Sequence, residues 1–228
     1  MSDTPPNKVW AVIPAAGKGH RFGAPIPKQY ATLAGISVLE HSLRRFDQHA
    51  AIDAIIVVTS KDDRHWQTLS LEYSKPVYTV IGGSERCHSV YNALQFLEDY
   101  AKPEDWVLVH DAARPCLTAD DLQKLFLQLK NDPVGGILAA PVTDTIKRVD
   151  HAGCYLGTED RACLWRALTP QVFRYRVLLT ALTHIINNGD LVTDVPKIVA
   201  GRSDNIKVTT AEDLLLAEQF LKNSVSLE

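Results

Sequence analysis

The sequence predicts an α/β fold: a mainly parallel, twisted sheet flanked by helices, of the Rossmann-like kind. Short apolar runs typical of buried strands alternate with segments of helical periodicity along the chain. The loops that carry the candidate site residues, 14–29, 82–89, 111–115 and 193–194, are each expected to follow a strand, where parallel sheets bind ligands. The 228 residues, 46% hydrophobic and 22% charged, are sufficient for one α/β domain with a full core.

Apolar runs and capping signals predict the strands and helices along the chain. Ser37 with Glu40 three residues later predicts a capping box, and Asp120 and Asp121 suit the first turn of a helix that begins near Thr118. The expected strands are 9–13, 52–58, 76–81, 106–110, 136–141 and, near the C-terminus, 205–209. The expected helices are 37–48, 84–97, one from about 118, 174–188 and 214–221.

A hairpin arm is expected over about 141–165. Short alternating segments, 145–149 and 154–157, flank the turn residues 150–153. Because two strands alone are marginal in water, the arm should pack on something, and a second subunit is a candidate. With no repeats or linkers in the sequence, residues 1–228 are interpreted as a single domain.

Charge and cysteine usage exclude several classes of function. The net charge of −3 gives no global sign of nucleic-acid or membrane binding, and no apolar run approaches the ~20 residues of a membrane helix. The N-terminus lacks a signal pattern. Neither disulfide nor zinc spacing relates the cysteines, so we expect reduced thiols and a cytoplasmic protein; they are Cys87, Cys116, Cys154 and Cys163.

The loop after the first expected strand favours a phosphate cradle. Glycines in a tight turn expose backbone N–H groups, and cationic side chains follow them. An ordinary turn with solvated charges is the alternative, and a classical dinucleotide fingerprint fails because its third glycine is absent. The glycines are Gly17 and Gly19, and the groups that can be cationic are Lys18, His20, Arg21 and Lys28.

Two further strand-end loops carry candidate ligand contacts. Gly82 and Gly83 permit close approach of a ligand, although the loop taken alone favours a plain strand-to-helix turn. In the other loop, Asp111 can accept bonds from sugar hydroxyls or hold a divalent metal, and Arg114 can hold a phosphate. An Asp111–Arg114 salt bridge that only stabilises the turn is the competing interpretation.

Charges on the hairpin and near the C-terminus are harder to assign. From spacing alone, Asp144, Thr145, Lys147 and Arg161 would form a solvated face. Lys207, between two apolar neighbours on an expected strand, should point away from them and be buried or face a site. Because the histidines show no ligand spacing and no nucleophilic triad can be assigned, we predict no metal-binding side chains.

Taken in order, these strings resemble the 2-C-methyl-D-erythritol 4-phosphate cytidylyltransferases of the non-mevalonate isoprenoid pathway. The resemblance runs from about Val9 to Leu221. The matching strings are Pro-Ala-Ala-Gly-x-Gly-x-Arg (14–21), Pro-Lys-Gln (27–29), Gly-Gly-x-Glu-Arg-x-x-Ser-Val (82–90), Val-His-Asp-Ala-Ala-Arg-Pro (109–115), Ala-Ala-Pro-Val-x-Asp-Thr-x-Lys (139–147), Leu-Thr-Pro-Gln (168–171) and Asp-Asn-Ile-Lys-Val-Thr (204–209).

The resemblance implies a nucleotidyltransferase fold and the transfer of CMP from CTP to methylerythritol phosphate, with Mg2+ bound mainly through the CTP phosphates. It implies a cytoplasmic homodimer whose hairpin arms swap, so that Thr145 and Arg161 serve the partner's site. Implied catalytic residues are Arg21, Lys28 and Lys207. Implied nucleotide-binding residues are Pro14, Ala15, Ala16, Gly17, Lys18, Gly19, Gly82, Gly83, Ser84, Ser89 and Ala112. Implied acceptor-binding residues are Asp111, Arg114, Thr145, Arg161 and Thr193.

Two departures from the family pattern stand out. Ser84 occupies a position that is usually Asp, so we expect a weaker or water-mediated contact near the cytosine. After Asp194 the chain resumes directly at Val195, as though a small-residue, acidic segment were deleted or were a disordered loop absent from the 228-residue sequence.

Other functions are also open at this stage. A ribitol 5-phosphate cytidylyltransferase would share the nucleotide half of the site and differ in the acceptor pocket. A catalytically silent nucleotide-binding domain is disfavoured, because binding alone would not require Arg21, Lys28 and Lys207 together.

Overall fold

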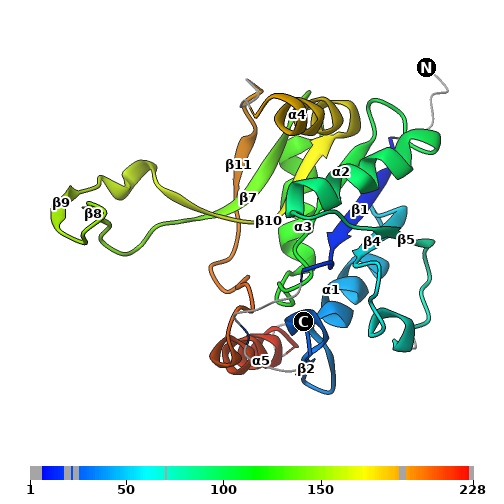
Figure 1. The fold of residues 1–228 in the computed structure, drawn as a ribbon, viewed down its shortest axis with the longest axis horizontal. Coiled ribbons are helices and arrows are strands. Elements are labelled where there is room, and N and C mark those ends of the chain that lie inside the picture. Colours follow the sequence, from blue (N-terminus) through cyan, green and yellow to red (C-terminus); the bar gives the residue numbers. More distant parts are fainter. Residues whose placement is uncertain (1–6, 18–21, 23–25, 70, 190–193, 226–228) are drawn as a thin grey trace.

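A mostly parallel sheet forms the centre of the molecule. The computed structural model describes residues 7–17, 22, 26–69, 71–189 and 194–225. Within these residues the main sheet has seven strands in the order β11-β7-β10-β6-β1-β4-β5 (Figure 1). The strands are β1 (Val9–Pro14), β4 (Ala54–Thr59), β5 (Val77–Ile81), β6 (Trp106–Val109), β7 (Gly135–Pro141), β10 (Trp165–Arg174) and β11 (Lys197–Ala200).

The pairing confirms the predicted class and adds an antiparallel strand. β1 pairs in parallel with β4 and β6, β4 with β5, and β7 with β11. β10 runs antiparallel to both β6 and β7, with a register shift between Ala167 and Gln171. The sequence did not predict this strand, because Pro170 within it removes a ladder donor and argues against a central strand.

Helices cover both faces of the sheet. α1 (Val38–Asp47) and α3 (Ala119–Leu129) pack on one face, where Leu43 and Leu125 share a core with Ile13 and Ile55. α2 (Arg86–Phe96) and α4 (Tyr175–Asn188) pack on the other face, against Val12 and Val58 (Figure 1). Because successive strand residues point to opposite faces, burial on both faces explains why β1 and β4 are almost continuously apolar.

Capping bears out the predicted starts of α1 and α3 and the predicted end of α4, whereas α5 (Ala211–Val225) extends beyond the expected 214–221 at both ends. The Ser37 side chain accepts from the Glu40 N–H and the Glu40 carboxylate accepts from the Ser37 N–H, which is the capping box. Thr118 caps α3 by accepting from the Asp121 N–H at 3.2 Å. α4 ends at Gly189, whose φ of 73° is the left-handed conformation that glycine adopts without strain.

The hairpin extends away from the sheet as an arm (Figure 1). It consists of the antiparallel strands β8 (Lys147–Val149) and β9 (Tyr155–Thr158), followed by the 3-10 turn η5 (Arg161–Cys163). Val149, Tyr155 and Leu156 on the arm are 51–64% exposed. The other elements are β2 (Thr32–Leu33), β3 (Ile36–Ser37), η2 (Lys28–Tyr30), η3 (Trp66–Thr68), η4 (Leu97–Asp99) and α5 (Ala211–Val225).

Two predictions from the sequence are wrong. Residues 205–209 form no strand; they run as an irregular segment beside the loop after β6, where the Val208 N–H donates to the Ala113 carbonyl at 2.8 Å. Asp194 follows α4 and precedes β11, so this loop does not follow a strand, and Thr193 lies outside the described residues. Among the helices of the described chain, none is long and apolar enough to cross a membrane.

Candidate active site

A pocket of about 390 Å3 opens where β1, β5 and β6 end. The loops that follow these strands line it, together with residues 207 and 209 from the C-terminal segment. This is the edge at which parallel sheets bind ligands. The lining residues are Pro14, Ala15, Ala16, Gly17, Lys28, Gln29, Gly83, Ser84, Glu85, Arg86, Ser89, Asp111, Ala112, Ala113, Lys207 and Thr209.

The loop after β1 is held in place by a buried glutamine. The Ala15 N–H donates to the Val58 carbonyl at 2.7 Å, which extends the β1–β4 ladder by one residue. Gln29 Nε2 then donates to the Ala15 carbonyl at 2.7 Å and to the Gly17 carbonyl at 3.1 Å. These two bonds fix the backbone of Ala15 and Gly17, which belong to the first part of the predicted cradle loop. Gln29 was not predicted as a site residue, although it ends the Pro-Lys-Gln string.

The loop after β5 requires its glycines for packing. A Cβ on Gly82 would lie 2.7 Å from Ala16 Cβ and 2.8 Å from Ser89 Oγ. Ser89 is buried; its Oγ accepts from the Gly83 N–H at 3.2 Å and donates to the Glu85 carbonyl at 3.1 Å. Gly82 therefore lies against the wall of the pocket, and a side chain there would push apart two of the loops that form it.

Gly17 presents the opposite case. Among the residues that the structure describes, a Cβ built on Gly17 meets no atom within 4 Å. The residue lines the pocket, so the space beside it is ligand space and not protein core. The glycine at this position therefore leaves room for something that approaches the backbone, whereas Gly82 is needed by the protein itself.

A carboxylate surrounded by cations forms one wall of the pocket. Asp111 Oδ1 lies 2.9 Å from Arg86 Nε, and Asp111 Oδ2 lies 2.8 Å from Lys207 Nζ. Arg114 Nε is 3.7 Å from Oδ2, while Arg114 Nη1 donates to the Asn205 carbonyl at 2.7 Å. The Asp111–Arg114 contact considered from the sequence is thus the longest of the three. Arg86 lies in the candidate loop 82–89, but the sequence predicted no role for its side chain.

The cations keep this buried carboxylate ionised. Burial by itself raises the pKa of Asp111, but the charge of Arg86 and the hydrogen bond from Lys207 outweigh it and hold the pKa well below the ordinary value. The side chain is only 11% exposed, so water screens these contacts less than it would on the surface.

A buried histidine fixes the backbone beneath Asp111. His110 Nε2 lies 3.0 Å from the Arg114 carbonyl, and Nδ1 lies 3.0 Å from Thr169 Oγ1. Thr169 Oγ1 also accepts from the Asp111 N–H at 3.1 Å. Burial lowers the pKa of His110 to about 4, so the ring is neutral at pH 7. The network assigns its proton to Nε2, which donates to the carbonyl, and Nδ1 accepts from Thr169.

Two lysines reach the pocket from different parts of the chain. Lys28 begins η2, and its Nζ donates to the Val208 carbonyl at 3.0 Å. Lys207 is the neighbour of Val208, and its side chain is 40% exposed. The bond from Lys28 therefore links the loop after β1 to the segment that carries Lys207, and it brings the two ammonium groups to one pocket.

The remaining predicted residues fall into distinct groups. Gly82 and Arg114 lie beside the pocket, because Gly82 packs against Ala16 and Ser89 and Arg114 lies 3.7 Å from Asp111. Thr145 and Arg161 are exposed residues of the hairpin segment, where Arg161 donates to the Thr143 carbonyl; β8 and β9 lie far from the pocket end of β1 (Figure 1). Lys18, Gly19, Arg21 and Thr193 lie outside the described residues. Pocket-lining residues not predicted are Gln29, Glu85, Arg86, Ala113 and Thr209.

The two glycines give a paired prediction. Gly17→Ala should leave the free energy of unfolding within about 0.5 kcal/mol of wild type and weaken CTP binding at least about tenfold, because the methyl group occupies ligand space. Gly82→Ala should lower the free energy of unfolding by about 1–3 kcal/mol through overpacking. Urea unfolding and equilibrium dialysis with CTP measure both effects. Unchanged CTP affinity in Gly17→Ala would remove this role for the loop.

The charged cluster gives a second prediction. At pH 7, Asp111→Asn should lower the free energy of unfolding by about 2–3 kcal/mol, less than for a fully buried pair because Arg86 and Lys207 are partly exposed. Since the folded-state pKa of Asp111 is depressed, its contribution is present above the unfolded value of about 3.9 and is lost as the pH falls below it. Urea unfolding should show a smaller difference in the free energy of unfolding between wild type and Asp111→Asn at pH 3 than at pH 7. Asp62→Asn, which changes an exposed carboxylate, is the control.

Comparison with known proteins places the site in a family. The family model described as 2-C-methyl-D-erythritol 4-phosphate cytidylyltransferase matches residues 9–223. A protein of this name from Pseudomonas fluorescens is 47% identical over 234 residues, covering 98% of this chain and 99% of its own length. One from Hahella chejuensis is 44% identical over 232 residues, covering 97% of this chain and 96% of its own length.

Solved structures of similar fold also match this chain over nearly its full length. The crystal structure of a 4-diphosphocytidyl-2C-methyl-D-erythritol synthase is 34% identical with a TM-score of 0.80, covering 95% of this chain and 100% of that one. The Francisella tularensis 2-C-methyl-D-erythritol 4-phosphate cytidylyltransferase is 34% identical with a TM-score of 0.78, covering 93% and 99%. The residues that line the pocket come largely from the strings that carry the resemblance in the sequence. Together with the nearly full-length matches of sequence and fold, this shows that the chain belongs to the 2-C-methyl-D-erythritol 4-phosphate cytidylyltransferase family.

Proposed function

We propose that this protein transfers the cytidylyl group of CTP to 2-C-methyl-D-erythritol 4-phosphate and releases pyrophosphate, in isoprenoid precursor biosynthesis. The observation that carries the proposal is the pocket itself. Glycine loops at the ends of parallel strands leave room for a nucleotide, and Lys28, Lys207 and Arg86 supply positive charge beside it. The family membership supports the identity of both substrates.

The reaction requires little covalent work from the protein. An oxygen of the acceptor phosphate attacks the α-phosphorus of CTP, a new P–O bond forms, and the bond to the bridging oxygen breaks so that pyrophosphate leaves with the electron pair. Negative charge gathers on the oxygens around the α-phosphorus during this exchange. Lys28 and Lys207 offset that charge, and this is the main contribution of a protein to such transfers. We assign Arg21 the same role by the resemblance.

The two ends of the pocket suit different parts of the substrates. Ala15, Ala16, Gly17, Gly83 and Ser89 form the side that we assign to cytosine and ribose, where backbone groups can be approached closely. Asp111 lies on the side that we assign to the acceptor. Its two oxygens offer about four acceptor positions, so a polyol hydroxyl can bind there in addition to Arg86 and Lys207.

The donor set fits Mg2+ held mainly through the CTP phosphates. Of the carboxylates that line the pocket in the described chain, Asp111 already carries cations on both oxygens, and Glu85 is at the exposed rim. Mg2+ commonly binds through substrate phosphates and water, so it does not require a dedicated protein cage. When bound, the ion would neutralise phosphate charge, while Lys28 and Lys207 act on the α-phosphate.

We propose that the hairpin arm pairs two copies of the chain in the cytoplasm. Two strands alone are marginal in water, and the arm exposes Val149, Tyr155 and Leu156. The strands β8 and β9 lie far from the pocket end of β1 (Figure 1), and Thr145 and Arg161 flank them in the sequence, so a swapped arm that reaches the partner's pocket would give these two residues a role.

We also propose that a segment is missing at the junction of Asp194 and Val195. The alignment with the Pseudomonas fluorescens relative runs over 234 residues, whereas this chain has 228. The relative therefore has residues with no counterpart in this chain, which supports a deletion or an omitted loop. Asp194 and Val195 are both exposed, a location at which a surface loop is readily gained or lost.

Substrate choice tests the function. Pyrophosphate release with CTP and methylerythritol phosphate should exceed release with CTP and ribitol 5-phosphate at least about a hundredfold in kcat/KM, since a site built for one polyol loses its hydrogen bonds with another. Lys28→Ala should lower kcat about a hundredfold or more and leave CTP binding nearly unchanged. Preference for ribitol 5-phosphate would replace the proposed acceptor, and normal turnover by Lys28→Ala would contradict the assigned role.

Mixing two inactive variants tests the swapped arm. Lys28→Ala disables a chain's own pocket, and Arg161→Ala disables the arm. If the arm serves the partner, a mixed dimer has one pocket with both residues intact. A statistical 1:1 mixture should then recover about a quarter of wild-type activity, because half the dimers are mixed and each has one intact site. If Arg161 serves its own pocket, mixing restores no activity. Either variant alone at the same total concentration is the control.

A further inference from the structure

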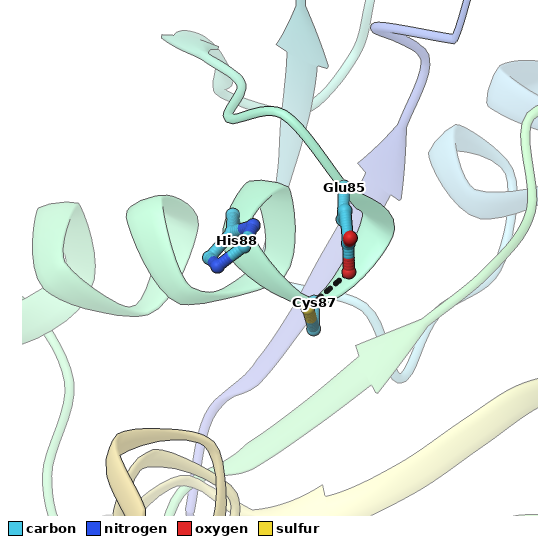
Figure 2. Close-up of side chains that lie close together, drawn as sticks. All are labelled: Glu85, Cys87 and His88. Carbon is cyan, nitrogen blue, oxygen red and sulfur yellow. Dashed lines mark hydrogen bonds between the residues drawn. The ribbon is translucent and has the colours of Figure 1, made fainter. Parts of the chain in front are cut away.

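We propose that Glu85, Cys87 and His88 form a Zn2+ site at the rim of the nucleotide pocket, and that its occupation inhibits nucleotidyl transfer. These residues lie at the start of α2, where Glu85 is the N-cap (Figure 2). Metal binding at this site is independent of the function proposed above; the inhibition rests on that function.

The ligand atoms are already close to a metal-binding arrangement. One ligand atom from each residue lies within 4.8 Å of the others. Cys87 Sγ lies 3.6 Å from Glu85 Oε2, and Figure 2 shows the carboxylate reaching toward the thiol, with the His88 side chain on the same end of the helix. Ligands of tetrahedral zinc lie about 2.0–2.3 Å from the ion, so pairs of them are roughly 3.3–3.8 Å apart. Side-chain rotations that move the ligand atoms by about 1 Å would bring all three within bonding distance of one ion.

The chemistry of the three groups selects zinc over magnesium. A thiolate, an imidazole and a carboxylate are typical zinc ligands, whereas Mg2+ prefers oxygen donors alone. Three protein ligands leave a fourth position for water. On binding, the Cys87 thiol proton leaves to solvent and the sulfur bonds to the ion. Thiolate and carboxylate together neutralise the charge of Zn2+, so the positive end of the helix does not oppose its binding.

Neighbouring groups hold the histidine in position. Ser84 Oγ lies 3.0 Å from His88 Nδ1. When Nδ1 carries the proton and donates to this hydroxyl, Nε2 presents its lone pair, and an outer contact of this kind orients a metal-binding histidine. Gly83 packs closely beneath, since a Cβ there would lie 2.4 Å from His88 Cβ. The residues around the cluster therefore restrict the ring before any ion arrives.

The site shares residues with the pocket, which explains the inhibition. Ser84, Glu85 and Arg86 line the pocket, but Cys87 and His88 do not. Zinc would draw Glu85 toward Cys87 and retain the Ser84 hydroxyl on His88. It would also fix the turn that carries Arg86, whose Nε holds Asp111. Ser84, which the resemblance assigns to nucleotide binding, and the lining residue Glu85 would then be held by the zinc site, so CTP should bind less tightly.

Equilibrium dialysis with Zn2+ alone tests the site. Wild-type protein should bind one ion per chain, and Cys87→Ser or His88→Gln should weaken binding by more than about tenfold. Cys154→Ser, which removes an exposed thiol from the hairpin, is the matched control and should bind as wild type. Co2+ in place of Zn2+ should give a thiolate charge-transfer band that Cys87→Ser lacks. Binding by both α2 variants at wild-type strength would overturn the proposal, whatever the enzyme activity.

Steady-state kinetics test the inhibition separately. Added Zn2+ should raise the KM for CTP severalfold in wild type and Cys154→Ser, and should not raise it in Cys87→Ser or His88→Gln. Zinc also binds free CTP, and the variants correct for this because they receive the same solutions. Equal inhibition of all four proteins would overturn the regulatory half of the proposal. Absence of transferase activity in wild type would refute the proposed function and leave the dialysis result standing.

Discussion

The Asp111 carboxylate is the interaction on which the pocket depends. It lies at the end of β6 and is bound by Arg86 at 2.9 Å and Lys207 at 2.8 Å, with Arg114 farther away at 3.7 Å. Arg86 begins α2 and Lys207 belongs to the segment before α5, so one side chain joins three parts of the chain that are distant in sequence. A charge buried to this degree is stable only when it is paired, and the pairing fixes the positions of cations that a phosphate-bearing substrate requires.

The rest of the pocket repeats this pattern of a buried polar group that ties loops together. Gln29 binds the carbonyls of Ala15 and Gly17, Lys28 reaches the carbonyl of Val208, and Thr169 accepts from the Asp111 N–H. Each of these bonds satisfies a backbone group that lies outside the strands and has no ladder partner. The loops are therefore positioned by the same interactions that permit them to be buried, and a nucleotide would meet a largely preformed surface.

Local patterning predicted most of the fold, because buried strands and amphipathic helices show their periodicity in short windows. The capping box at Ser37 and the glycine after α4 placed helix ends correctly for the same reason. β10 escaped prediction because its antiparallel place between β6 and β7 is decided by distant partners, and Pro170 obscures the local signal. Residues 205–209 resemble a strand locally, but Val208 pairs with the loop at Ala113 and no continuous ladder forms.

The sequence by itself determined the class of fold, the family and three of the four loops expected at the pocket, since these follow from local periodicity and from ordered strings of residues. The fourth expected loop is an exception, because Asp194 follows α4 and not a strand. Only the tertiary structure decided that Arg86 binds Asp111, that Gln29 holds the loop after β1, and that Gly82 serves packing whereas Gly17 borders open space. Such contacts depend on where helices and loops approach one another and on side-chain direction, which the spacing of residues along a chain does not encode.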